Sequence, residues 1–525
     1  MKEGFRQAMA WLHTWAGLIF GWLLFAIFLT GTLSYFKSEI THWSQPEVPV
    51  RALDNATSLE LAQDYLQRHA PDAASWFIQL PNAREPALAV SWRAPGAGRR
   101  DSTEKILDPL DGSEITPRES RGGDFFYRFH FQLEMPYPWG RWLSTFAALM
   151  MLVGLVTGII THKKIFKEFF TFRPGKGQRS WLDGHNAIGV LVLPFHLMIS
   201  YSSLVIFMSM VMPASIIASY GNDTRAFFND VFGPQRNVER ANQPQPLQSL
   251  PALYHKVAEA APGKHIAWVE VQQPGDRNAQ VRFTPETSER IARQRGAGWV
   301  FDGADGSLTY SELPEPAPML IAGGMYGLHM GEFAGPVLRW VYFFFGLAGT
   351  AVIGSGLVMW LGKRQLKHAK SGTQPFEMRL VEVLNIASMS GLVLGVVAFF
   401  WANRLLPVTL QGRADWEINA FFGVWSLALL HALLRPGRRA WGEQLALAAL
   451  LCAGLPLLNG LTSGQGLNHS LANGDWIMAG VDLTALGCGL FFAWTARTML
   501  RPAVVAAKRA PKPAKAAPVL EAEVN

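Results

Sequence analysis

The stretch SWLDGHNAIGVLVLPFHLMISYSSLVIF, residues 180–207, is apolar enough to cross a membrane, yet it contains His185 and His196. An imidazole in or near hydrocarbon is costly without a partner, so such histidines indicate a functional site. On a straight helix the two rings lie roughly 16 Å apart along the axis and differ by only about 20° around it. We therefore expect both rings on one side of one helix, at two depths. Pro194 precedes His196 and is a residue at which a helix can bend.

The composition of the 525-residue chain is that of a membrane protein. Apolar residues make up 49% of it and charged residues 17%, a balance that favours a membrane protein over a soluble one. The net charge of +7 lies largely in short basic segments beside apolar runs, as the positive-inside rule expects, so it predicts no nucleic-acid partner. The two cysteines, Cys452 and Cys488, lie in apolar runs, which argues against a disulfide framework, a zinc cluster and an iron–sulfur cluster.

The hydropathy of the chain predicts about eight membrane spans, since a hydrocarbon core requires about 20 apolar residues per helix. They fall at residues 11–36, 141–161, 186–212, 338–361, 381–403, 417–434, 441–459 and 477–499. The first span reads as a retained signal anchor because it is too long for a cleaved signal peptide. The basic stretches at 162–179, 362–370 and 435–439 are expected in the cytoplasm. Both termini then lie on that side, and residues 501–525 form a disordered cytoplasmic tail.

Two long polar segments, residues 37–140 and 213–337, are consequently expected on the outer face. Each contains a candidate helix, SLELAQDYLQRH in the first and SLPALYHKVAEA in the second. A strand–turn–strand pattern follows in each, KILDPLDGSEI and GWVFDGADGSLTY, in which Asp-Gly between extended residues predicts a hairpin. The predicted fold is thus a membrane all-α bundle carrying two periplasmic α+β modules.

The first four spans repeat their motifs, which predicts an internal duplication. His-x-x-x-Gly opens the first span at His13 and the third at His185. Tyr-x-x-His, followed by Arg-Trp ten or eleven residues later, precedes the second span and the fourth. The last four spans lack this pattern. The predicted order is a first span (1–36), a module (37–140), two spans with a cytoplasmic loop (141–212), a second module (213–337), a fourth span (338–361), a four-helix extension (376–500) and a tail (501–525).

Six histidines near membrane boundaries are the candidate site residues. Three lie on the cytoplasmic side and three lie deeper or on the outer side: His13, His162 and His185, then His130, His196 and His329. Two ligands at two depths suit two stacked b-type haems, because haem iron accepts neutral imidazole on each side. For the inner haem the repeat favours His13 with His185, and His162 competes for that place. For the outer haem we expect His196 with either His329 or His130.

Other readings of these residues remain open. A single histidine at a membrane boundary is usually solvated or hydrogen-bonded there, whereas six at repeat-related depths favour a site. Gly17 and Gly189, one turn from His13 and His185, have no Cβ and let a flat macrocycle approach the backbone. Arg141 and Arg339 are interfacial anchors or partners of haem propionates. Protease, esterase and dinucleotide-site motifs are missing from the sequence.

Three longer strings resemble the PepSY-associated transmembrane family: WLHTWAGLIFGWLLFAIFLTGTLSYF, THKKIFKEFFTFRPGKGQRSWLDGHNAIGVLVLPFHLMISYS and LHMGEFAGPVLRWVYFFFGLAGTAVIGSGLVMW. The resemblance covers about residues 5–365, and the outer modules resemble PepSY domains. It implies a bacterial inner-membrane protein linked to iron uptake, with haem held by the six histidines. It also implies reduction of ferric siderophores in the periplasm.

The residues and the resemblance together predict a ferric-siderophore reductase. Electrons from quinol or a cytoplasmic reductase are expected to pass from the inner haem b to the outer one. They would then reduce Fe(III) held by a siderophore or another periplasmic chelate. Two alternatives come from other classes: a haem-free scaffold or regulatory protein whose modules bind a partner, and a proton-coupled transporter in which buried histidines relay protons.

Overall fold

The computed structural model describes most of the chain. It covers residues 3–50, 54–98, 101–162, 172–223, 225–228, 238–287, 290–293, 298–311, 317–369 and 375–501. Half of the basic loop predicted at 162–179 and nearly all of the tail predicted at 501–525 lie outside the described residues.

Within the described residues, seven helices are long and apolar enough to cross a membrane. They are α1 (Glu3–Ser34), α5 (Trp139–Thr161), α13 (Pro336–His368), the combined α14 (Phe376–Ile386), η2 (Ala387–Gly391) and α15 (Leu392–Leu405), α16 (Arg413–Leu434), α17 (Arg438–Ser463) and α19 (Trp476–Leu500). Each coincides with one of the eight predicted spans. The chain is therefore a multi-pass membrane protein, as its hydropathy predicts.

The remaining predicted span, 186–212, is broken, and the expectation of one straight helix is wrong. α6 (Gln178–Leu191) and α7 (Leu193–Ile206) meet at an angle of 66°. Pro194 lies in the first turn of α7, where its missing N–H and its ring prevent a regular helix from continuing through Val192. His185 and His196 thus lie on two helices, and no single stripe holds both. The short helices α8 (Met208–Val211) and α9 (Ala214–Tyr220) follow.

The outer segments form one antiparallel sheet, where two separate modules were expected. Its strands are β1 (Ser75–Gln79), β2 (Leu88–Arg93), β3 (Ser102–Leu107), β4 (Glu114–Ile115), β5 (Ile266–Gln272), β6 (Gln280–Pro285), β7 (Trp299–Asp302) and β8 (Leu308–Tyr310). The strand order is β4-β3-β2-β1-β5-β6-β7-β8, so β1 pairs with β5 at the centre. Both predicted hairpins are present, β3 with β4 and β7 with β8. The two halves merge because each would otherwise leave the edge of β1 or β5 unpaired.

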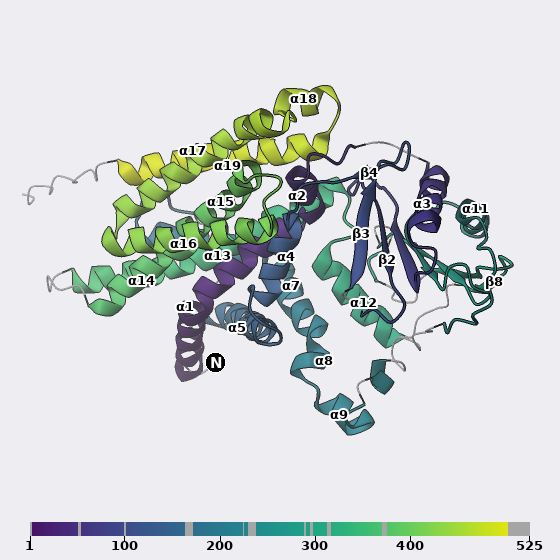
Figure 1. Cartoon of the computed structure of the whole chain (residues 1–525). Coiled ribbons are helices and arrows are strands. Elements are labelled where there is room, and N and C mark those ends of the chain that lie inside the picture. The colour runs from purple at the N-terminus through teal and green to yellow at the C-terminus, as the bar shows by residue number, and fades with distance from the viewer. Residues whose placement is uncertain are drawn as a thin grey trace, which may run out of the picture.

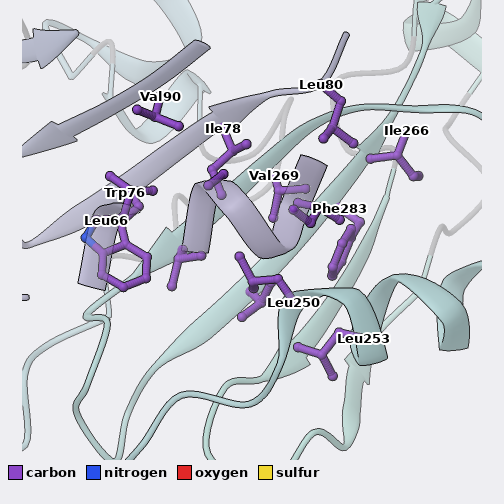
Figure 2. Close-up of a cluster of buried hydrophobic side chains, with 14 of the residues drawn as sticks. Leu66, Trp76, Ile78, Leu80, Val90, Leu250, Leu253, Ile266, Val269 and Phe283 are labelled. Carbon is purple, nitrogen blue, oxygen red and sulfur yellow. The ribbon is translucent and has the colours of Figure 1, made fainter. Parts of the chain in front are cut away.

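Two helices cover one face of this sheet, α3 (Asn55–His69) and α11 (Leu250–Ala260) (Figure 2). Alternate residues of the central strands, such as Ile78 and Val269, point to Leu66 and Leu253 on the helices and are almost fully buried. Burial of each such side chain contributes about 1.5–3 kcal/mol. The predicted helices begin where the sequence caps them: the Asp54 carboxylate accepts the Thr57 N–H. The first helix–strand unit of each outer segment therefore packs into a single core.

Shorter helices join the sheet to the membrane helices (Figure 1). They are α2 (Lys37–Ser44), α4 (Gly122–Gln132), α12 (Ala317–Met330) and, between α17 and α19, α18 (Leu467–Ala472). α4 packs on α1, α2 and α5, whereas α12 packs on α7, the second half of the broken span. α19 also contacts α2. The sheet lies at one end of the molecule, and α17 and α19 run along the upper edge of the helical part in this view (Figure 1).

Candidate functional site

The first pair of candidate residues is His13 on α1 and His185 on α6. Their ring centroids lie 6.4 Å apart with an angle of 80° between the ring planes. His13 Nδ1 donates to the Gly154 carbonyl on α5 at 2.9 Å, and His185 Nδ1 lies 3.0 Å from the Ser355 hydroxyl on α13. Four helices thus fix the two rings. This is the inner pair that the repeat predicts.

The second pair is His130 on α4 and His329 on α12. Their ring centroids lie 6.1 Å apart, with 40° between the planes. His130 Nδ1 donates to the Ile27 carbonyl on α1 at 2.7 Å, and His329 Nδ1 lies 2.9 Å from the Ser202 hydroxyl on α7. Again each ring is oriented by a helix other than its own.

The hydroxyl partners determine the tautomers of His185 and His329. The Ser355 hydroxyl donates to the Val352 carbonyl at 2.9 Å, and the Ser202 hydroxyl donates to the Ile199 carbonyl at 3.1 Å. Each hydroxyl has one proton, so it accepts from the histidine Nδ1–H. His13 and His130 carry the proton on Nδ1 as well, since carbonyls accept from them. All four rings therefore present Nε2 as the basic nitrogen, the arrangement typical of a metal-ligating histidine held by a second partner.

The separations within the pairs fit two imidazoles on opposite sides of one metal. With metal–nitrogen bonds of about 2.0 Å and each ring nitrogen about 1 Å from its centroid, the centroids would lie about 6 Å apart. Among the described residues, no group of three or more His, Cys, Asp or Glu side chains is placed to hold a metal ion. Pairs of imidazoles are the donor set of a bis-histidine haem, whose macrocycle supplies the other ligands. The residues present therefore fit haem in their chemistry and spacing.

His196 and His162 are placed differently from these four. His196 is completely buried, its ring contacts Phe28 and Phe195, and its Nε2 lies 3.4 Å from the Phe345 carbonyl. The structure places His130 beside His329, and it does not place either beside His196, so the geometry disfavours the expected outer pairing with His196. His162 Nε2 accepts from the Asn186 amide at 2.8 Å, whereas His185 faces His13. His162 is therefore a neighbour of the inner pair, and its coordinating nitrogen is already hydrogen-bonded.

Glycines leave room at both pairs. A Cβ at Gly17 or Gly189, the glycines of the His-x-x-x-Gly motifs, would meet no atom within 4 Å, so the space beside both glycines is open. At Gly31 a Cβ would lie 2.4 Å from His130 Nδ1, and at Gly349 it would lie 2.6 Å from His196 Nε2. Nothing in the sequence around Gly31 reveals that a histidine of α4 packs against it.

The family model described as the PepSY-associated TM region matches residues 10–363. The chain belongs to this family. The match includes all six candidate histidines and ends within α13, so most of α13 and the whole outer sheet belong to the family region. Helices α14 to α19 lie beyond it. Comparison with curated proteins found no match to this chain.

Tyrosines of the repeated Tyr-x-x-His motif flank the outer pair of this PepSY-associated protein. Tyr127 and Tyr326, each one turn before its histidine, hydrogen-bond to each other, and burial raises the pKa of Tyr127. Arg293 donates to the Tyr326 hydroxyl at 2.6 Å. The two linked tyrosines therefore lie one helical turn from the outer pair.

The outer histidines are kept neutral by their surroundings. Burial lowers the pKa of His130. Burial and the neighbouring His130 together lower the pKa of His329 to about 3. Neutral imidazole is the form that binds haem iron.

The two arginines of the repeat have different surroundings. Arg141 lies over the Phe131 and Tyr137 rings, as expected of an interfacial anchor. Arg339 is buried, donates to Glu39 at 2.8 Å and to the Ala334 carbonyl, and so is a member of a buried ion pair. Arg141 therefore has the surroundings of an interfacial anchor, whereas Arg339 pairs with Glu39 on α2, a partner that sequence spacing does not reveal.

Proposed function

We propose that this membrane protein holds two b-type haems and passes electrons across the membrane to ferric iron on its outer face. The observation that carries the proposal is the matched geometry of two histidine pairs, each about 6 Å between centroids and each with Nδ1 held by the protein. His13 with His185 would hold the inner haem, and His130 with His329 the outer one. Bound in these sites, haem supplies reversible one-electron transfer.

The chain's own residues would orient and insulate these sites. The carbonyls of Gly154 and Ile27 and the hydroxyls of Ser355 and Ser202 fix each imidazole plane and raise its basicity. Two ligands per iron leave no open position, which favours electron transfer over oxygen chemistry. The apolar helices around the pairs would keep water away. His162 and His196 would support the neighbouring helices.

We place the protein in a bacterial inner membrane with both termini in the cytoplasm. The basic stretches between spans support this orientation, which puts the sheet and the outer pair in the periplasm. The equivalent positions of His13 and His185, and of His130 and His329, support an internal duplication of the first four spans. The proposed substrate is a ferric siderophore or another Fe(III) chelate, since hard oxygen donors hold Fe(II) more weakly. The proposed electron donor is quinol or a separate cytoplasmic reductase.

Absorption spectroscopy of the full chain in detergent tests the proposal. The wild type should contain two haems per chain, with a Soret band and α-bands that appear on reduction. His185→Ala and His329→Ala should each remove about half of the haem, from different sites, whereas His162→Gln and His196→Gln should retain both. After reduction, a ferric trihydroxamate should reoxidise the haems with release of Fe(II) to a ferrous chelator.

Other outcomes would contradict the proposal in defined ways. A colourless protein from cells with ample haem would support the haem-free scaffold or the transporter. Full haem content in both His185→Ala and His329→Ala would defeat the ligand assignment. Loss of one haem in His196→Gln would return His196 to the outer site. Substrate flux into vesicles without any reductant would favour the proton-coupled transporter.

A further inference from the structure

A cavity of about 1170 Å³ lies where the outer sheet meets the membrane helices. The wall on the side of the sheet includes Ala267 and Trp268 of β5, and Glu39 of α2 also lines the cavity. The cavity continues into the membrane region between α13, α15, α17 and α19. Its volume exceeds that of ordinary small-molecule pockets, about 300–1,000 Å³. The histidine pairs do not line it, so it is a separate feature of the molecule.

The membrane part of the cavity is an apolar channel. α19 lines it with residues spaced along one face from Trp476 to Phe492, about 24 Å of helix at 1.5 Å per residue. Several of these residues are small, including Gly480, Ala485 and Cys488. α15 and α17 form the facing walls with valines, Leu455 and Cys452. Such a channel accepts a long hydrocarbon chain over most of a bilayer core of about 30 Å.

The outer end of the cavity is polar and its charges balance. Glu39 accepts from Arg84 at 2.9 Å and from Arg339 at 2.8 Å, so one carboxylate joins the sheet segment to α13. The rim carries four cationic and four anionic side chains: Lys37, Arg84, Arg293, Arg339, Glu39, Glu85, Glu286 and Glu332. Aromatic rings lie beside them: Trp268, Trp340, Phe36 and Phe343. A balanced rim suits a neutral head group that accepts and donates hydrogen bonds, whereas a phosphate would require an excess of positive charge.

We propose that this cavity binds an isoprenoid quinone, with its ring at the polar rim and its prenyl tail along α19. The aromatic rim fits a flat ring, and the apolar channel fits a chain too long for the rim alone. Tyr127 and Tyr326 also line the cavity, which places the ring one helical turn from His130 and His329. Binding does not depend on haem. Any electron transfer from a quinol bound here would rest on the proposed function and would go directly to the outer pair, not through the inner pair. The cavity thereby gives the last four spans a role, since they form most of its membrane wall.

The test measures decylubiquinone binding by the full chain in lipid nanodiscs, together with the prenyl quinone retained through purification. Ala485→Phe places a ring in the channel and should raise the dissociation constant at least tenfold. Val481→Phe, at another lining position, should do the same. Ala493→Phe is the matched control on the same helix, because Ala493 is exposed outside the cavity, and it should bind within twofold of the wild type.

Four results decide the matter. Tenfold weakening in Ala485→Phe or Val481→Phe, with Ala493→Phe unchanged, supports the site. Each of three results would overturn it: undetectable binding by the wild type, equal binding by both channel variants and the control, or displacement of decylubiquinone by phosphatidylglycerol. Haem content measured in the same samples separates this inference from the proposed function. If the protein is colourless but binds quinone, only the quinone site is supported. If it contains haem but does not bind quinone, only the proposed function is supported.

Discussion

A single hydroxyl group determines which nitrogen the His329 imidazole of the outer pair offers. Ser202 accepts from His329 Nδ1, whereas its neighbour Ser203 donates to the Ser200 carbonyl within α7. We expect Ser202→Ala to weaken haem binding at the outer site by about 10- to 100-fold, as loss of such a second partner typically does. Ser203→Ala is the adjacent control and should leave haem affinity unchanged. Haem titration of the apoprotein measures both, and equal affinity in the two variants would contradict the role of Ser202.

A buried carboxylate in the sheet region predicts an acid sensitivity. Burial would raise the pKa of Asp276, but N–H donors of Asn278, Ala241 and Gln243 and the charge of Arg240 outweigh burial and lower it. A carboxyl group with a lower pKa in the folded state stabilises that state above its unfolded pKa of about 3.9. This stabilisation is lost as the pH falls through the lower folded value.

Asp276→Asn tests whether the folded state prefers the charged carboxylate. The variant should have a lower melting temperature than the wild type at pH 7, and the difference should shrink as the pH falls below about 4. Circular dichroism of the β signal against temperature measures it. A difference that grows on acidification would mean that the folded state does not prefer the charged carboxylate.

Local patterns made the membrane helices predictable. Hydropathy and length alone place a span such as α13, because each apolar helix satisfies its own backbone hydrogen bonds. The break between α6 and α7 was missed even though Pro194 was recognised, since a proline permits a bend without fixing its angle. The ring partners were only partly predicted. The His-x-x-x-Gly repeat led to His13 with His185, whereas the Tyr-x-x-His repeat, which relates His130 to His329 in the same way, was not used and His196 was expected in the outer pair.

The junction between α15 and α16 rests on a buried ion pair. Arg413 and Glu417 are completely buried, and their side chains lie 2.6 Å apart. Arg413 also donates to the Asn403 carbonyl at the end of α15. Arg413→Ala leaves Glu417 buried without its cation, which typically costs about 3–5 kcal/mol.

The exposed pair Arg435–Glu443, 2.8 Å apart, provides the comparison. Arg435→Ala should cost less than about 1 kcal/mol, because solvent screens that pair. Thermal unfolding in detergent distinguishes the two variants. Equal melting temperatures for Arg413→Ala and Arg435→Ala would show that the buried pair contributes nothing to the junction.

Across the whole molecule, the sheet depends on strands that are far apart in the chain. Ser75–Gln79 pairs with residues 268–272, a contact that hairpin signals cannot predict because it joins two separate segments. We expect residues 54–115, produced alone, to aggregate or remain unfolded, since the β1 edge is then bare. The same segment mixed with residues 238–311 should form a soluble one-to-one complex. Size-exclusion chromatography measures both, and a stable monomer of the first segment alone would contradict a shared sheet.

The β1–β5 pairing also constrains how the protein is made. The ribosome must add about 190 residues between these strands, which takes roughly ten to forty seconds at ordinary elongation rates. In the orientation that we propose, the first half of the sheet leaves the translocation channel during that interval, and the edge of β1 is then open to solvent. Chaperones on that side of the membrane would therefore be expected to bind the unpaired edge of β1. The binding would last until the second and third membrane spans have been inserted and β5 has been made.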